Sequence, residues 1–281
     1  MNKNVVITGV SSGIGLAAAQ VLIGRGYRVF GSVRNRADAD RVRQALGGGF
    51  TPLLFDVTDS AGLAAAVAEV QAAVGEHGLA GLVNNAGVAC AGPLMHVPMQ
   101  EVRKTFDINV FGLLAVTQAF LPLLGARHGA THAPGRIVNL SSISGGLVFP
   151  LVSVYAMSKF AVEALSDGLR RELSIYGIAV SALEPGVIKT PIWDKGPPPG
   201  APGYEATDFG GAMAAQPAIF AKELKNAIPM EVVTNAICHA LEARRPKARY
   251  PLTAMWHVRK WIPARWLDRL LIRAAALKTA H

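Results

Sequence analysis

The sequence NVVITGVSSGIG, residues 4–15, predicts how the chain begins to fold. Its first five residues form a short apolar run typical of a buried strand, and glycines then follow at positions 9, 13 and 15. A helix is expected next, because Ile14, Ala17, Ala18, Val21 and Leu22 share one helical face. A strand, a glycine turn and a helix N-terminus together let backbone N–H groups and the helix dipole meet a pyrophosphate. The spacing differs from G-x-G-x-x-G, so we treat it as a variant of that fingerprint, with an ordinary tight turn as the alternative.

Strand-like and helix-like stretches alternate along the rest of the chain. Strands are expected at 27–33, 53–57, 81–84, 136–140, 178–183 and 248–252, and helices at 60–74, 100–124, 155–176 and 230–243. This alternation predicts an α/β fold with a parallel, doubly wound sheet. Residues 187–229, rich in proline and glycine, interrupt the pattern and are expected to form a lid over a pocket. We expect one domain at 1–252, including this lid, and a basic amphipathic extension at 253–281.

Composition and charge exclude several classes of protein. The 281 residues are 51% hydrophobic and 17% charged, which indicates a globular chain, and no apolar run approaches the roughly 20 residues of a membrane span. Cys90 and Cys238 lie far apart without companion ligands, so neither a disulfide framework nor a metal site is expected. These features favour a reducing cytoplasm. The net charge of +9 resides after residue 243, where Asp268 is the only acid, which argues against a chain-wide nucleic-acid surface.

The end of the second strand bears on nucleotide choice. An acid about twenty residues beyond the glycines binds the ribose 2′-hydroxyl of NAD, whereas an arginine there suits the 2′-phosphate of NADP. Here Val33 is followed by Arg34, and the first acid is Asp38. NADP(H) is therefore favoured, with NAD(H) as the alternative if Arg34 is only solvated surface.

The stretch SISGGLVFPLVSVYAMSK, residues 142–159, is where we expect the chemistry. Tyr155 and Lys159 are four apart, so on a helix the ammonium lies within reach of the phenol. A nearby positive charge lowers the pKa of a phenol, which would make Tyr155 a general acid or base. Ser142 follows a buried strand and is placed to hydrogen-bond a carbonyl or alkoxide oxygen. The spacing alone is weak evidence, since many helices pair a core Tyr with a solvated Lys.

Asn109 stands in the middle of the helix expected at 100–124. Asparagine is a poor residue there because its amide competes for backbone hydrogen bonds. Either a functional role or a bend in the helix would account for it.

The ordered set Thr8-Gly9-x-x-x-Gly13-x-Gly15, Asp56, Asn84-Asn85-Ala86-Gly87, Asn109, Ser142, Tyr155-x-x-x-Lys159 and Pro185-Gly186 resembles the short-chain dehydrogenase/reductase family over about residues 3–252. The phrases at 33–35 and 155–165 are most similar to its hydroxysteroid and retinol dehydrogenase branch. The resemblance implies a Rossmann sheet of seven parallel strands. It also implies an NADP(H)-dependent oxidoreductase acting on a hydrophobic alcohol or ketone, as a homodimer or homotetramer.

The same resemblance assigns roles to residues. Tyr155 would be the acid/base, Ser142 would polarise the substrate oxygen, Lys159 would bind the nicotinamide ribose and lower the pKa of Tyr155, and Asn109 would hold a water. The cofactor would be bound by Gly9, Ser11, Ser12, Gly13, Ile14, Arg34, Asp56, Val57, Asn84, Ala86, Gly87, Tyr155, Lys159, Pro185, Gly186, Val187, Ile188 and Thr190. Two other classes stay open: a catalytically silent cofactor-sensing regulator on the same fold, and a lyase or epimerase of the extended branch.

Apolar residues around the expected pocket indicate a bulky hydrophobic substrate, of steroid, retinoid or lipid type. They are found in 145–152, at Leu94 and Met95, and in the lid at Ile192, Trp193, Phe209, Met213 and Phe220. The tail, residues 255–278, carries tryptophans and leucines at roughly helical spacing with arginines between them. Such a helix either packs over the lid or on another subunit, or lies on an anionic membrane.

Overall fold

The computed structural model describes residues 3–190 and 203–278. In this part of the chain one sheet of seven parallel strands runs in the order β3-β2-β1-β4-β5-β6-β7. The strands are β1 (Asn4–Ile7), β2 (Arg28–Val33), β3 (Phe50–Leu54), β4 (Gly81–Asn84), β5 (Arg136–Leu140), β6 (Ala179–Glu184) and β7 (Arg249–Pro251). The doubly wound parallel sheet predicted from the sequence is therefore confirmed.

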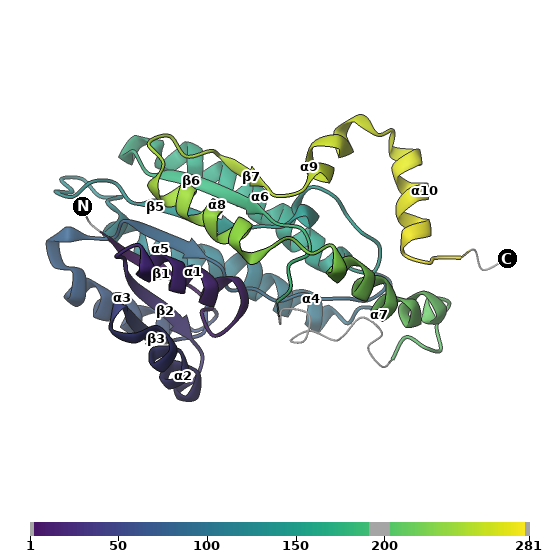
Figure 1. Cartoon of the computed structure of the whole chain (residues 1–281), viewed down its shortest axis with the longest axis horizontal. Coiled ribbons are helices and arrows are strands. Elements are labelled where there is room, and N and C mark those ends of the chain that lie inside the picture. Colours follow the sequence, from purple (N-terminus) through teal and green to yellow (C-terminus); the bar gives the residue numbers. More distant parts are fainter. Residues whose placement is uncertain (1–2, 191–202, 279–281) are drawn as a thin grey trace.

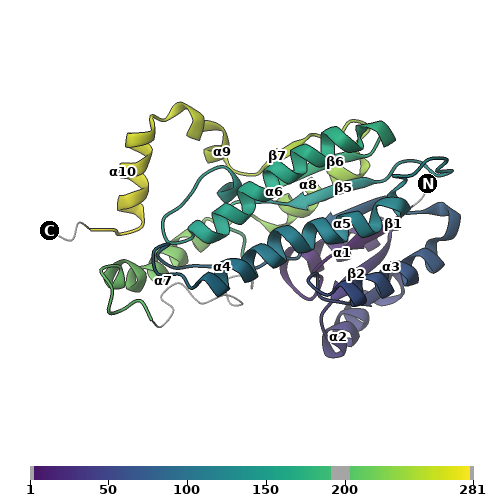
Figure 2. The same cartoon turned by 180° about the vertical axis from the view of Figure 1, so that it is seen from behind.

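Helices cover both faces of the sheet (Figures 1 and 2). One face carries α1 (Gly13–Gly24), α2 (Arg36–Leu46) and α8 (Met230–Glu242); the other carries α3 (Ser60–Val74), α4 (Met99–Phe106), α5 (Leu113–Phe120) and α6 (Ser153–Glu172). Successive strand residues point to opposite faces of the sheet. Val5 and Ile7 belong to the hydrophobic core under α1 and α8, and Val6 belongs to the core under α3 and α5. Burial on both faces explains why the strands are continuously apolar rather than alternating.

The third strand lies three residues earlier than the 53–57 expected from the sequence. Pro52 lies inside this strand, although proline cannot donate a hydrogen bond to a sheet. In the structure β3 is at the sheet edge, and Pro52 pairs with Gly31 of β2. An edge strand tolerates proline where the missing N–H would face outward. Asp56 and Val57 consequently follow the strand instead of ending it.

The helix expected at 100–124 is continuous but not regular. Between α4 and α5 the segment Asp107–Gly112 is π-helical, with Asn109 inside it. The stretch Met99–Leu124 is the one helix among the described residues that is long and apolar enough to cross a membrane, and half of its most apolar window is buried. Core helices of folded domains pass the same test, and α5 packs against the sheet.

The lid region and the tail are helical where the structure describes them. α7 (Gly210–Lys225) occupies part of the expected lid, and residues 191–202, with Ile192 and Trp193, lie outside the described residues. The tail contains α9 (Ala254–Val258) and α10 (Ala264–Ala274), which stand at one end of the molecule beyond the sheet (Figure 1).

Candidate active site

The carboxyl ends of β1, β4, β5 and β6 meet at one edge of the sheet. β1 pairs with both β2 and β4, so the chain order reverses between β1 and β4. In open α/β sheets a ligand crevice lies outside the strand ends at such a reversal. The glycine turn, the loop 85–87, Ser142 and Pro185 all follow these strands.

The glycine turn is fastened to its neighbours by hydrogen bonds. Gly9, at φ +72°, donates its N–H to the Ser32 hydroxyl at 2.9 Å. The Asn85 amide donates to the carbonyls of Thr8 and Gly9, at 2.8 and 3.0 Å. A Cβ on Gly15 would collide with that amide and with the Gly9 carbonyl. The backbone is therefore held in a shape that only glycine permits, which fits the close approach of a phosphate group.

The N-terminus of α1 faces the same edge. Its first turn contains no acidic residue, and its N-cap Ser12 makes no side-chain capping hydrogen bond. Nothing in that turn repels an anion, and the dipole of the helix favours one. Ser11, in the glycine turn, is held by α2, because its carbonyl accepts a 2.8 Å hydrogen bond from the Arg41 guanidinium.

Basic groups gather where β2 ends. Arg34 directly follows the strand and is exposed to solvent. Arg41, which the sequence analysis did not single out, is paired with Asp38 at 2.6 Å while it reaches Ser11. Asp38 also accepts from the Asn35 amide at 3.1 Å. Asp38, the first acid after the strand, is thus engaged by its own neighbours, and its spacing to Arg41 was the available signal.

Asp56 and Val57 line the next strand end. The Asp56 carboxylate accepts hydrogen bonds from the N–H and the hydroxyl of Thr58, at 3.0 and 2.7 Å. Val57 is buried beside Gly112, where a Cβ would lie 2.7 Å from a Val57 methyl. These contacts shape the turn, and they leave the second carboxylate oxygen of Asp56 for a ligand.

The structure places Asn84 inside the protein, away from the crevice. Its amide nitrogen donates to the Thr117 hydroxyl and to the Asn139 side chain, both at 2.9 Å. The role expected for Asn84 at the cofactor ribose therefore has no support from its side chain. Asn85, which the sequence analysis left without a role, connects the loop to the glycine turn. Ala86 is held by its N–H to the Thr8 hydroxyl at 2.9 Å.

Ser142, Tyr155 and Lys159 lie together at the end of β5. Ser142 begins a short 3-10 turn at Ile143–Gly145, and its hydroxyl is hydrogen-bonded with the hydroxyl of Tyr155. The Lys159 ammonium donates to the Leu140 carbonyl at 2.7 Å and lies 5.6 Å from the centre of the Tyr155 ring. All three are buried. The adjacent loop approaches Asn109 closely, since a Cβ on Gly87 would lie 3.2 Å from the Asn109 side-chain oxygen.

Burial sets the protonation of this group. It raises the pKa of Tyr155 to about 12, and the hydrogen bond with Ser142 opposes that rise. Burial also lowers the pKa of Lys159 to about 8, against the attraction of Glu163. The expectation that Lys159 lowers the pKa of Tyr155 stays a prediction; the net shift is upward here, because loss of hydration outweighs the hydrogen bond with Ser142. The phenol is therefore a protonated hydrogen-bond donor at neutral pH.

Asn109 bridges the helix to the loop beside Lys159. Its side-chain oxygen accepts from the Val88 N–H at 2.9 Å, and its nitrogen donates to the Val88 carbonyl and to the Ser158 hydroxyl, at 2.9 and 3.0 Å. The π-helical turn supports the interpretation that this residue distorts its helix. Its amide is used to hold the loop after Gly87, so a water on Asn109 would have to be bound by other atoms.

The residues after β6 complete the edge of the crevice. The Pro185 carbonyl accepts from Ile143 N–H at 2.8 Å, which ties this strand end to the turn that starts at Ser142. Ile188 pairs with Ile228, whose N–H donates to the Val187 carbonyl at 2.9 Å. A Cβ on Gly186 would meet the Thr253 methyl at 2.6 Å. The remaining expected residue, Thr190, is half-buried.

An apolar hollow lies between the loop after Ser142 and α7. It is lined by Ala91, Leu151, Val152, Met213, Gln216, Ile219, Phe220 and Glu223. Met213 and Phe220 were expected in a substrate pocket, whereas Leu94 and Met95 are exposed to solvent. Phe209 packs against the buried cluster beneath α7. Among the described residues no group of three or more His, Cys, Asp or Glu is placed to hold a metal ion.

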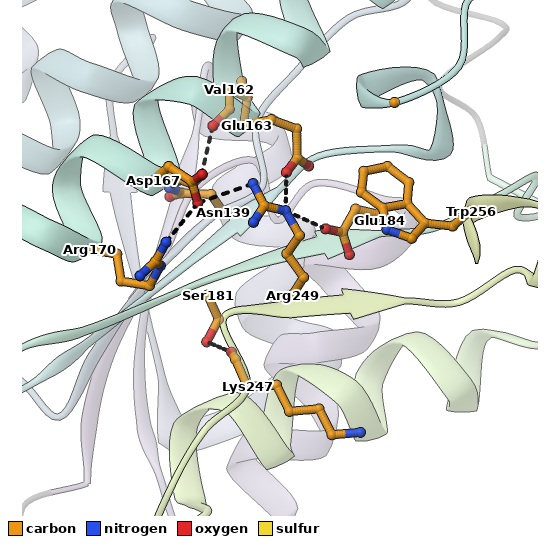
Figure 3. A network of polar contacts seen from close by, with 12 residues as sticks. Asn139, Val162, Glu163, Asp167, Arg170, Ser181, Glu184, Lys247, Arg249 and Trp256 are labelled. Carbon is orange, nitrogen blue, oxygen red and sulfur yellow. Dashed lines mark hydrogen bonds and ion pairs between the residues drawn. The ribbon is translucent and has the colours of Figure 1, made fainter. Parts of the chain in front are cut away.

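Behind Lys159 a second polar cluster fills the space between α6 and β7 (Figure 3). Arg249 contacts Glu163 at 3.0 Å, Asp167 at 3.1 Å and Glu184 at 3.6 Å. Glu184 has no exposed surface, and neither of its carboxylate oxygens has a hydrogen-bond partner. Burial and the repulsion of Glu163 raise the pKa of Glu184 to about 8, so this side chain is neutral at pH 7.

Comparisons with known proteins agree with the fold and extend it. The sequence model described as short chain dehydrogenase matches residues 3–198. The chain is 42% identical to an NADPH-dependent 3-dehydrocapnine reductase of Ornithobacterium rhinotracheale, over 95% of each chain. It is 34% identical to human retinol dehydrogenase 5, over 97% of this chain and 87% of that protein. A short-chain dehydrogenase from Streptomyces avermitilis has a similar structure, with a TM-score of 0.73, 28% identity, and coverage of 98% of this chain and 95% of that one.

Proposed function

Since the chain belongs to the short-chain dehydrogenase family, we propose that it is an NADP(H)-dependent oxidoreductase. It transfers a hydride between nicotinamide and the carbonyl or alcohol carbon of a hydrophobic substrate. The observation that carries this proposal is the buried group at the end of β5, in which Ser142 is hydrogen-bonded with Tyr155 and the Lys159 ammonium lies 5.6 Å from the Tyr155 ring. A regulator that only senses nucleotide has no need of such a group.

The strand-end crevice fits a dinucleotide. Glycine at 9 and 15 lets the turn pack closely against Ala86 and Asn85, and the N-terminus of α1 offers N–H groups to a pyrophosphate. Arg34 follows β2, where the 2′-phosphate of NADP(H) would lie, and Asp38 is already paired with Arg41. The similarity to a reductase named as NADPH-dependent supports the same preference, with NAD(H) as the alternative.

In the reductive direction the bound NADPH supplies the hydride, and the protein controls the oxygen of the substrate. Tyr155 donates its proton to that oxygen as negative charge develops, because its phenol is protonated at neutral pH. Ser142 turns its hydroxyl from Tyr155 to the same oxygen and stabilises the charge. Lys159, still an ammonium below about pH 8, stabilises the phenolate that remains.

The substrate is proposed to be a bulky apolar ketone, aldehyde or alcohol. The hollow between residues 151–152 and α7 offers Leu151, Met213 and Phe220 to it, and only Gln216 and Glu223 of its lining are polar or charged. Such a surface suits a steroid, retinoid or lipid-like molecule better than a sugar phosphate. Similarity to a retinol dehydrogenase supports this class.

A direct assay tests the proposal. The protein is incubated with NADPH and a panel of hydrophobic ketones and aldehydes, and oxidation of NADPH is followed together with the product alcohol. We expect Tyr155→Phe to bind NADPH normally, by fluorescence titration, while kcat falls 10²- to 10⁴-fold, because the proton donor is gone. Near-normal turnover in this variant would refute the assignment, and silence of the wild type across the panel would favour the sensor.

We also propose that the chain works in the cytoplasm as a homodimer or homotetramer and does not bind nucleic acid. The basic charge that would attract nucleic acid is confined to the tail. Gel filtration with light scattering tests the oligomeric state.

A further inference from the structure

Only part of the apolar surface of the C-terminal tail packs against the rest of the chain. Leu271 and Ala275 are buried, and Leu277 packs against the cluster that contains Leu151 and Met213. The Gln216 amide of α7 donates to the Ala275 carbonyl at 3.2 Å. The tail therefore docks on the lid helix, as one of the two interpretations of the sequence expected.

A second apolar strip on α10 points to solvent. Trp266 is 70% exposed and Leu270 54% exposed, and Ala274 is exposed one turn further on. These residues are four apart, so they form one continuous strip along the helix. Trp261, just before α10, is 87% exposed. So much exposed aromatic and aliphatic surface in one short segment marks an interaction site.

A row of arginines runs beside this strip. Arg265, Arg269 and Arg273 each directly precede or follow a member of the apolar strip, are four apart, and are exposed. Within the described part of the chain none of the three is in an ion pair. Asp268 is the only acid on α10. The outer surface of the helix is therefore half apolar and half cationic.

We propose that this face of α10, with Trp261, binds the surface of an anionic lipid bilayer. A helix with adjacent apolar and basic strips lies in the plane of the interface, where its apolar side chains enter the acyl region and its arginines meet anionic headgroups. A second copy of the chain fits the face less well, because its arginines would have no acidic partners there, and an antiparallel two-fold contact would bring two rows of arginine together. The membrane is thus the complementary partner.

The position of α10 gives this contact a use. α10 stands at one end of the long axis of the molecule (Figures 1 and 2). Through Leu277 and Ala275 it contacts the cluster that borders the apolar hollow. A bilayer bound here would bring lipophilic molecules close to that hollow. This use rests on the proposed function, but the binding itself does not.

Vesicle sedimentation tests the binding without cofactor or substrate. We expect the wild type to sediment with vesicles containing about one-third phosphatidylserine, and at least 10-fold less with pure phosphatidylcholine. Raising the salt to 1 M should weaken the binding, since the Debye length falls to about 3 Å. Failure to bind anionic vesicles, in a preparation that oxidises NADPH with a soluble ketone, would overturn the membrane proposal and leave the proposed function standing.

Variants locate the contact. Changing Arg265, Arg269 and Arg273 to Gln should weaken binding about 100-fold, at about 1 kcal/mol for each arginine near the surface. Trp266→Ser with Leu270→Ser should weaken it to a similar extent while keeping the salt dependence. The matched control is Arg43→Gln on α2 with Ile175→Ser, both exposed elsewhere.

Three results would contradict the assignment. Equal binding by control and α10 variants would place the lipid contact elsewhere on the chain. If Trp266→Ser with Leu270→Ser instead halved the molar mass in light scattering, the strip would belong to a contact between copies. A labelled single-stranded oligonucleotide, added as a competitor, should not displace the vesicles; displacement would assign the basic row to nucleic acid.

Discussion

At the scale of single residues, the chemistry depends on how far side chains are removed from water. Tyr155 and Lys159 share a buried site, and burial moves the pKa of each toward its neutral form, to about 12 and about 8. Spacing predicted that the two would be neighbours, but it contains no information on hydration. The sign of the shift on Tyr155 therefore required the structure.

Arg34 is expected to select the nucleotide. Arg34→Ala should raise the KM for NADPH roughly 10- to 100-fold, the value of one or two charged hydrogen bonds to a phosphate, and leave the KM for NADH nearly unchanged. Steady-state kinetics with both nucleotides measure this, and Arg43→Ala on the exposed face of α2 is the control. An equal effect on both nucleotides would contradict the NADP(H) preference.

Glu184 is expected to make stability depend on pH. Its folded pKa of about 8 lies above the ordinary 4.5, so between these values the folded chain holds a proton that the unfolded chain releases. The free energy of unfolding should therefore fall as pH rises from 4.5 to 8, by up to a few kcal/mol, and then level off. The charged groups around it are Glu163, Asp167, Arg249 and Arg259.

Urea unfolding at pH 5.5 and pH 8.5 measures the effect. Glu184→Gln keeps the size of the side chain but cannot ionise, so the variant should lose most of the difference between the two pH values. A difference of the same size in wild type and variant would show that another group is responsible.

At the scale of elements, most of the fold could be predicted because the spacing of apolar residues in the sequence distinguishes the buried strands from the helices. The strands at 81–84 and 136–140 and the helix at 60–74 lie where the pattern placed them. The third strand was misplaced because its edge position, which makes Pro52 harmless, is a property of the sheet rather than of the segment. Asn109 did suggest a bend in its helix, but its contact with Val88 on a distant loop could not be predicted from the segment.

Asn109 is expected to stabilise that turn. Asn109→Ala removes three hydrogen bonds and leaves the N–H and carbonyl of the half-buried Val88 without these partners, so the free energy of unfolding should fall by about 3 kcal/mol. Ser158→Ala, which removes one of these bonds and one to the Tyr155 carbonyl, should cost about 1–2 kcal/mol. Equal losses in the two variants would show that the bonds to Val88 contribute nothing.

At the scale of the whole molecule, the candidate site is assembled from both ends of the sequence. The glycine turn follows β1, the Ser142 turn follows β5, and Arg259 of the tail donates to the Gly146 carbonyl at 2.7 Å while it stacks on Trp256 at 3.9 Å. The sequence motifs end near residue 252, so they gave no sign that the tail takes part. Asn85, Arg41 and Arg259 were missed for the same reason: their partners are distant in the chain.

Arg259, which belongs to none of the sequence motifs, is expected to be needed for a normal kcat. Arg259→Ala frees the Gly146 carbonyl and loosens the turn that carries Ser142, and displacement of a reacting group by about 1 Å costs up to about 10²-fold in rate. We expect kcat to fall while binding of NADPH is unchanged. Arg265→Ala, exposed on α10, should leave the turnover of a soluble ketone unaltered. A normal kcat in Arg259→Ala would show that this contact of the tail does not contribute to catalysis.

The bond between Arg259 and Gly146 also bears on how the protein can be engineered. A shortened protein that ends near residue 252 would keep all the sequence motifs. The turn that begins at Ser142 would nevertheless lose its hydrogen bond from Arg259. A chimera that takes its substrate specificity from a relative should therefore take the tail and the 142–152 loop from the same protein, because Arg259 of the tail is hydrogen-bonded to Gly146 of the loop.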